Sequence, residues 1–163
     1  MNEQQAIRLV RLYSDMILRI SYHYLNHCSD AEDICQSVFL KYLSLNTSFK
    51  DNNHEKAWII RTTINECKDS LKSSWRKKIV SLDVVSDREI PKEPHNELNS
   101  AIKKLPKNYR LSIYLYYYEG YSAREIGSFI GKSENTVCAY LSRGRKKLKD
   151  ILSESDEGGI SNV

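Results

Sequence analysis

Glycine and proline are scarce in this chain, which has six glycines and three prolines among its 163 residues. Leucine, isoleucine, lysine, glutamate and tyrosine are abundant in their place, and this mixture favours helices. We therefore predict an all-α protein. The length allows one domain of ordinary size or two small helical domains.

Long apolar runs are also missing. No stretch of the sequence approaches the length of a transmembrane helix. The first residues, MNEQQAIRLV, lack the apolar core of a signal peptide. We expect a cytoplasmic protein that is not itself inserted in a membrane.

The chain has little that points to metal binding or to catalysis. The four cysteines form no CxxC pair and fall within helical patterns, so we expect reduced packing residues; they are Cys28, Cys35, Cys67 and Cys138. His23, His27 and Cys28 come nearest to a metal site, but the residues around them are not HExxH. Clustered acids at metal-ligand spacing, a glycine-rich phosphate loop and a nucleophile–base pair are all missing. We predict no metal, no cofactor, no small-molecule substrate and no enzymatic activity.

Charge, in contrast, is abundant and unevenly distributed. The formal net charge is +4, but two basic blocks, at 68–78 and 143–149, flank an acidic strip at 83–97. Residues 79–95 lose helical periodicity and contain Pro91 and Pro94. The pattern predicts two small helical domains joined by a flexible linker, with one nucleic-acid contact in each domain.

Residues 121–149 have the signature of a helix-turn-helix. Ser122 and Glu125 form a Ser-x-x-Glu capping box at the start of a helix, and Gly131 ends that helix. Ser133 caps the next helix after only two residues, and so short a turn favours a crossed pair of helices. Such a pair places its second helix in the major groove of DNA.

The second helix has two distinct faces. Its apolar stripe consists of Val137, Leu141, Gly144, Leu148 and Ile151. The opposite side carries small, amide and basic side chains that suit base edges and phosphates, namely Asn135, Ala139, Ser142, Arg143 and Lys146. The alternative to DNA contact is that these side chains form an ordinary basic helix end that faces solvent.

The N-terminal half contains three further helical patterns. A long amphipathic helix stops near Asn26–Ser29, and Ser29 with Glu32 forms a second capping box. After a polar loop at 46–53, a third helix runs from about Glu55 to Ser74 or beyond. One side of this helix carries a polar and basic row that ends in an aromatic residue, namely Arg61, Asn65, Lys68, Lys72 and Trp75. Such a row suits contact with DNA backbone and bases. The alternative is an ordinary solvent-exposed helix face.

Another helix is expected from Tyr109 to Tyr118, directly before the helix-turn-helix. Its YLYYY run, at 114–118, resembles a platform for stacking bases. On a helix, however, these rings point in different directions, so we predict core packing with amphipathic edges.

Two strings carry a resemblance to a known family. DAEDICQSVFLKYL (30–43), followed by AWIIRTTINECKDSLKSSWRKK (57–78), resembles domain two of bacterial RNA polymerase sigma factors. Residues 102–152 resemble domain four of the same proteins. Two such domains with only a short linker are typical of the extracytoplasmic-function (ECF) group. The resemblance implies a promoter-specificity subunit with domain two at 1–78 and domain four at 97–152. The acidic segment at 79–96 would link them, and the polar tail at 153–163, outside the resemblance, is expected to be disordered.

The resemblance also implies roles for individual residues. The helix matching 30–43 would dock on core polymerase through Asp30, Glu32, Asp33 and Gln36. The helix matching 57–78, with the loop before it, would read the −10 element and hold a flipped base, using Arg61, Asn65, Lys68, Lys72 and Arg76. Phe49 is the only aromatic residue of the 46–54 loop.

In domain four, the resemblance adds Cys138 to the residues that would read the −35 element. Cys138 and Ala139 stand where the family commonly has an arginine and a small polar residue, so we expect an altered promoter preference. The resemblance further implies an anti-sigma partner, often membrane-bound, and a role in a stress or cell-envelope response.

Two other functions compete with this interpretation. A stand-alone helix-turn-helix regulator would need only the C-terminal domain, and it would leave residues 30–78 unexplained. A nucleic-acid hydrolase with a DNA-binding tail would need catalytic groups that the sequence does not provide.

Overall fold

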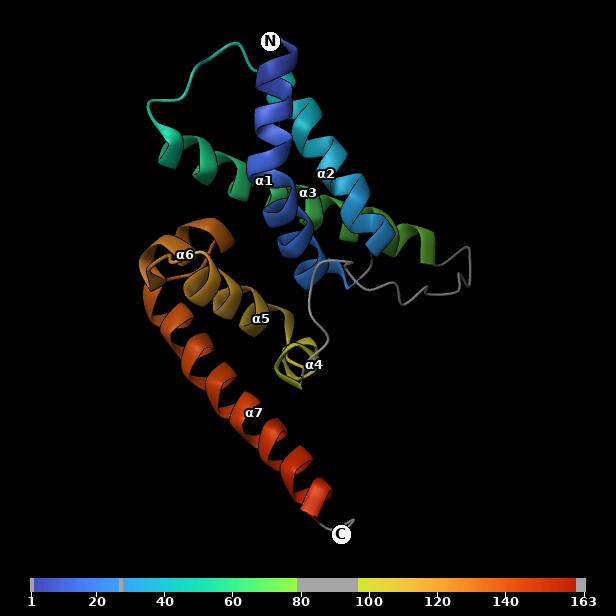
Figure 1. The fold of residues 1–163 in the computed structure, drawn as a ribbon, viewed down its shortest axis with the longest axis vertical. Coiled ribbons are helices and arrows are strands. Elements are labelled where there is room, and N and C mark those ends of the chain that lie inside the picture. The colour runs from blue at the N-terminus through green and yellow to red at the C-terminus, as the bar shows by residue number, and fades with distance from the viewer. Residues whose placement is uncertain (1, 27, 79–96, 161–163) are drawn as a thin grey trace. The chain divides into compact units, whose positions relative to one another are not determined.

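Helices and the turns between them make up the part of the chain that the structure describes. The computed structural model describes residues 2–26, 28–78 and 97–160, and these ranges contain no strand. The chain divides into two compact units, Met1–Ile90 and Pro91–Val163 (Figure 1). The predicted all-α class with two helical parts is confirmed. The linker predicted at 79–96 lies outside the described residues.

The N-terminal unit is built from three helices, α1 (Glu3–Leu25), α2 (Cys28–Leu43) and α3 (Asn52–Lys78). In Figure 1, α1 and α2 lie side by side and α3 crosses them. Apolar side chains from all three helices meet between them and are fully buried, among them Ile17, Ile20, Val38, Ile60 and Ile64. This shared core holds the outer faces of α2 and α3 in fixed orientations.

The ends of these helices partly match the prediction. Asn26 adopts the left-handed conformation, with φ of 59°, and ends α1 where the sequence predicts a stop. The predicted Ser29–Glu32 capping box is wrong: α2 begins at Cys28, so Ser29 lies inside the helix it was expected to cap. The third helix begins at Asn52, earlier than predicted, because Asp51 Oδ1 accepts a 2.8 Å hydrogen bond from the backbone N–H of His54.

The C-terminal unit contains α4 (Glu97–Lys103), α5 (Lys107–Ile113), a single π-helical turn η1 (Tyr114–Tyr118), α6 (Ala123–Ile130) and α7 (Glu134–Ile160). Helices α4, α5 and α6 each pack against α7 (Figure 1). The core between them is formed by Leu105, Leu111, Leu115, Ile126 and Val137.

Helix α7 differs from the prediction at its C-terminal end. The sequence predicts a disordered tail from residue 153, whereas the backbone stays helical to Ile160. A helix continues as long as each backbone N–H finds the carbonyl four residues earlier, and residues 153–160 contain no proline that would prevent this. Residues 161–163 lie outside the described part of the chain.

Candidate nucleic-acid interface

A tight turn between α6 and α7 sets the geometry of the first candidate surface. The Ser122–Glu125 capping box is present, with both of its hydrogen bonds at 3.1 Å. Gly131 has a φ of 73°, and the Lys132 N–H donates to the Gly127 carbonyl at 2.9 Å. These contacts confirm the predicted helix-turn-helix.

The start of α7 is capped as predicted. Ser133 Oγ accepts a 3.2 Å hydrogen bond from the backbone N–H of Thr136, so the helix begins at Glu134. From there, Val137 and Leu141 turn inward and are buried. The first two turns of α7 are therefore held rigidly against the rest of the unit.

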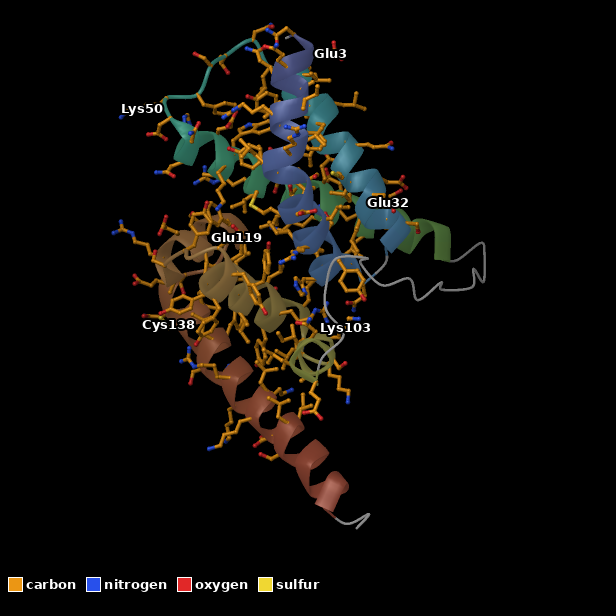
Figure 2. All side chains as sticks on the ribbon, viewed as in Figure 1. Glu3, Glu32, Lys50, Lys103, Glu119 and Cys138 are labelled. Carbon is orange, nitrogen blue, oxygen red and sulfur yellow. The ribbon has the colours of Figure 1, made fainter. Side chains whose placement is uncertain are left out.

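The outward face of α7 carries all six residues predicted to read the −35 element. Asn135, Cys138, Ser142, Arg143 and Lys146 are exposed, and Ala139 is half-buried. The prediction that all four cysteines are packing residues is wrong for Cys138, whose side chain lies on this surface and not in the core (Figure 2). Among the other cysteines, Cys67 is buried, and burial raises the pKa of the Cys35 thiol to about 11. The side chain of Cys28 lies outside the described residues.

Two other cations of α7 contact tyrosines at the edge of this face. Arg145 Nη1 donates a 3.1 Å hydrogen bond to the Tyr117 hydroxyl. Lys147 Nζ lies 5.9 Å from the centroid of the Tyr109 ring, within cation–π range. These contacts leave Arg143 and Lys146 as the basic side chains at the centre of the face.

The tyrosine run at 114–118 behaves differently from the prediction. Tyr114 and Leu115 are buried, but Tyr116, Tyr117 and Tyr118 are 41%, 54% and 53% exposed. In the π turn, the Glu119 N–H donates to the Tyr114 carbonyl, five residues back, at 3.3 Å. The wider turn shifts the later rings away from the core, so only the first part of the run packs there.

A second candidate surface lies on α3. Arg61, Asn65 and Lys72 are exposed and Lys68 is half-buried, while Ile60, Ile64 and Cys67 on the other side are buried. Arg76 belongs to the last turns of α3, and its side chain, like that of Trp75, lies outside the described residues. The predicted basic row is therefore presented to solvent from Arg61 to Lys72.

The loop before α3 is anchored by aromatic contacts. The Phe49 ring stacks on Tyr42, with centroids 5.6 Å apart and planes at 29°. Phe49 also meets Trp58 at 5.8 Å and His54 at 5.4 Å. Phe49 is half-buried in this cluster, whereas Asn46, Thr47 and Ser48 are exposed.

Behind the aromatic cluster lies a buried carboxylate that sequence reasoning missed. Glu55 is 5% exposed. One of its oxygens accepts from Tyr13 Oη at 2.7 Å and from Arg8 Nη2 at 3.1 Å. The other accepts from Tyr42 Oη at 2.6 Å and from Arg8 Nη1 at 3.3 Å. Because its donors come from α1 and α2, Glu55 ties three helices together.

The pKa values in this network follow from its contacts. Burial would raise the pKa of Glu55, but the hydrogen bonds from Arg8, Tyr42 and Tyr13 hold it below its ordinary value. Burial, reinforced by the bond to Glu55, raises the pKa of Tyr42 to about 12 and that of Tyr13 further still. Since Glu55 falls at the predicted start of a helix, the sequence marks it only as a first-turn acid.

A third candidate surface is acidic and lies on α2. Glu32, Asp33 and Gln36 are exposed and Asp30 is half-buried, while Ile34 and Val38 are buried on the opposite side. Figure 2 marks Glu32 on this helix. All four residues predicted to meet the polymerase therefore lie on α2 with at least part of their surface accessible.

The weak metal motif consists of His23, His27 and Cys28, and of these the structure describes only the side chain of His23. Within the described ranges, no three His, Cys, Asp or Glu side chains gather closely enough to hold a metal ion. His27 itself lies outside those ranges. No helix in the described part of the chain is long and apolar enough to cross a membrane.

Both units of the chain match known families. Residues 9–77 match "Sigma-70 region 2" and residues 95–148 match "Sigma-70, region 4". The ECF RNA polymerase sigma factor SigE of Mycolicibacterium smegmatis is 29% identical over 157 residues, which cover 90% of this chain and 61% of SigE. SigW of Bacillus subtilis is 29% identical over 167 residues, covering 90% of this chain and 88% of SigW.

Two solved structures share the fold. The sigma factor RpoE of Bartonella quintana, crystallised with the anti-sigma factor NepR, has a TM-score of 0.74 and 19% identity, covering 92% of this chain and 98% of RpoE. CnrH, solved with the cytosolic domain of CnrY, has a TM-score of 0.63 and 20% identity, covering 94% of this chain and 90% of CnrH.

The chain belongs to the sigma-70 family of RNA polymerase sigma factors and, within it, to the ECF group. Such proteins are non-enzymatic subunits that bind core RNA polymerase and promoter DNA for transcription initiation. The match over residues 9–77 accounts for the part of the chain that a stand-alone helix-turn-helix regulator leaves unexplained.

Proposed function

We propose that this sigma factor contacts its promoters through two separate faces, one in each unit. The supporting observation is that each unit presents a basic helix face backed by a buried apolar stripe, on α3 and on α7. The working boundaries are domain two at 1–78 and domain four at 97–152. The segment between them serves as the tether.

Helix α7 reads the −35 element as duplex DNA. Asn135, Ala139 and Ser142 are short enough to let the helix approach base edges, and Ala139 suits contact with a thymine methyl group. Arg143 and Lys146 follow on the same side and contact phosphates. Cys138 has only a weak donor, so it lacks the bidentate guanine contact of an arginine. The −35 preference therefore departs from that of relatives with arginine at this place.

Helix α3 and the loop before it read the −10 element during opening. Asn65 contacts a base of the non-template strand, while Arg61, Lys68, Lys72 and Arg76 hold its backbone. Opening a duplex requires several kcal/mol of unstacking, and a captured base with neutralised phosphates offsets it. The exposed polar residues of the loop, Asn46, Thr47 and Ser48, complete this surface.

The acidic face of α2 docks on core polymerase. Asp33 and Gln36 are exposed one turn apart, with Ile34 and Val38 buried behind them, so a charge reversal at Asp33 changes the surface without opening the core. Co-purification of the full chain with core polymerase tests this assignment. Asp33→Arg should abolish retention, and Glu3→Arg, an exposed acid on α1, should not. Equal retention of the Asp33→Arg variant and wild type contradicts the docking face.

A protein partner would regulate this sigma factor by binding it. RpoE and CnrH were each solved with a protein partner, an anti-sigma factor in the first case. A dedicated anti-sigma factor for this chain, often membrane-bound in the group, would hold it inactive in the cytoplasm until a stress or envelope signal arrives. Mapping transcription start sites after overexpression identifies the promoters. Start sites without a shared −35 and −10 pair contradict the two-face proposal.

A further inference from the structure

Tyr42 joins the buried carboxylate to the loop that precedes α3. Its hydroxyl donates a 2.6 Å hydrogen bond to Glu55, while its ring stacks on Phe49 and meets Trp58 edge-on at 5.9 Å. A side chain held at both its tip and its ring face has little rotamer freedom. The position of Phe49, and of the loop that carries it, therefore depends on where Glu55 holds Tyr42.

The far end of the same loop is fixed by reciprocal caps. His54 Nδ1 accepts from the backbone N–H of Lys50 at 3.3 Å, and Asp51 Oδ1 accepts from the His54 N–H at 2.8 Å. Figure 2 marks Lys50 at this end. Between the Phe49 anchor and the end of α2, Asn46, Thr47 and Ser48 remain exposed. The loop is thus fixed from Phe49 onward, and the residues that precede Phe49 are polar and accessible.

The Phe49 ring packs against other rings of the N-terminal unit. The rings of Tyr42, His54 and Trp58 lie within 5.8 Å of its ring, centroid to centroid. Tyr42 stacks on one face of this ring, so a base stacking on that face would have to displace Tyr42. The only aromatic residue of the loop serves as its anchor, and contacts to a DNA strand fall to the polar residues beside it.

We infer that Glu55 is a positioning residue which, through Tyr42 and Phe49, presets the loop at 44–51 for the single DNA strand. The inference rests on the proposed function, in which this loop contributes to reading the −10 element. A loop already in its bound conformation loses less conformational entropy on binding than a free one. The buried carboxylate thereby acts on DNA affinity without touching DNA.

Tyr13 provides a matched control. The Tyr13 hydroxyl donates a 2.7 Å hydrogen bond to Glu55, much as the Tyr42 hydroxyl does. Tyr13, however, belongs to α1 and is not one of the three residues whose rings surround Phe49, which are Tyr42, His54 and Trp58. Tyr13→Phe and Tyr42→Phe each remove one hydroxyl from Glu55 and keep the ring. A purely structural role predicts the same outcome for both variants.

Two measurements separate the two roles. Hydrogen exchange of residues 44–51 in the full chain reports how firmly the loop is held. Binding of a single-stranded −10 oligonucleotide to the holoenzyme, reconstituted with core polymerase, reports its use. We expect Tyr42→Phe to speed loop exchange about tenfold and to weaken oligonucleotide binding about three- to tenfold. Tyr13→Phe should leave both readouts within about twofold of wild type.

Each other outcome has a definite meaning. Unchanged loop exchange in Tyr42→Phe, or equal acceleration in both variants, overturns the positioning role of Glu55. Faster loop exchange in Tyr42→Phe alone, with unchanged oligonucleotide binding, supports that role and contradicts the assignment of the loop to the −10 element. Failure of the proposed function is thus distinguishable from failure of the inference.

Discussion

The backbone N–H of Lys132 donates a 2.9 Å hydrogen bond to the carbonyl of Gly127, and the Lys132 carbonyl oxygen in turn lies in the space that a Cβ at residue 127 would need. A Cβ at Gly127 would overlap that oxygen. Because the clash involves backbone on both sides, neither partner can rotate away. The close turn between α6 and α7 therefore needs glycine at this position for space.

Gly127→Ala should destabilise the C-terminal unit by about 1–3 kcal/mol and weaken −35 duplex binding, since α7 must shift to relieve the overlap. Urea unfolding followed by circular dichroism measures the loss. Both tryptophans, Trp58 and Trp75, belong to the N-terminal unit, so the fluorescence transition should stay unchanged. Ser128→Ala, an exposed change on the same helix, serves as control. Equal stability of Gly127→Ala and wild type would show that the turn is not tightly set.

Lys146 and Lys147 are neighbours in sequence but differ in surroundings. Lys146 is exposed on the −35 face, whereas Lys147 lies over the Tyr109 ring. We predict that Lys146→Gln weakens holoenzyme binding to −35 duplex DNA and lowers the slope of log K against log salt by about 0.9. Lys147→Gln should change that slope by less than half as much. Binding titrations at several salt concentrations test this, and an unchanged slope in Lys146→Gln contradicts a phosphate contact.

Asn65 lies on the exposed side of α3, and its proposed base becomes available only when the duplex opens. Asn65→Ala should therefore reduce open-complex formation about tenfold while closed-complex affinity changes less than about threefold. Permanganate reactivity of unpaired thymines reports opening, and footprinting at low temperature reports the closed complex. Lys72→Gln, a backbone contact in this account, should weaken both steps alike. Equal loss in both steps for Asn65→Ala would refute a base-specific role.

Glu55 should make the N-terminal unit sensitive to acid. Its hydrogen bonds hold the pKa below the ordinary value of 4.5 despite burial, so its stabilising effect is present above that value and is lost as pH falls through the folded pKa. We predict that Glu55→Gln lowers the free energy of unfolding by about 2 kcal/mol at pH 7. The difference from wild type should shrink as pH falls below 4.5.

Urea unfolding followed by tryptophan fluorescence at pH 7 and at mildly acidic pH values measures this difference. Glu3→Gln, an exposed acid in the first turn of α1, provides the control. A gap between Glu55→Gln and wild type that stays constant across the acid range would mean that the carboxylate charge is not what Glu55 contributes.

Local patterns predict the helix-turn-helix accurately because every feature that sets it is close in sequence. The Ser122 box, the left-handed Gly131 and the Ser133 cap act over three or four residues. The buried stripe that begins with Val137 follows from helix periodicity alone. The outward face of α7 can therefore be derived from the spacing of its residues.

Features that depend on distant residues cannot be derived in this way. The partners of Glu55 lie up to 47 positions away, and nothing in a helical pattern marks a buried acid among exposed ones. The exposure of Tyr116 to Tyr118 depends on one π turn, which shifts the ring positions that a regular helix would give. The Ser29 motif has the spacing of a capping box, but the helix starts at Cys28, two residues before the start that this box would set. The spacing of residues alone does not show which of several neighbouring positions begins a helix.

The most direct test of the central claim is run-off transcription with purified core polymerase on a promoter identified by start-site mapping. We predict that the chain programs core enzyme to make one specific transcript, and that changing either the −35 or the −10 element abolishes it. A chain that binds duplex DNA tightly by itself but yields no promoter-specific transcript with core polymerase would contradict this assignment.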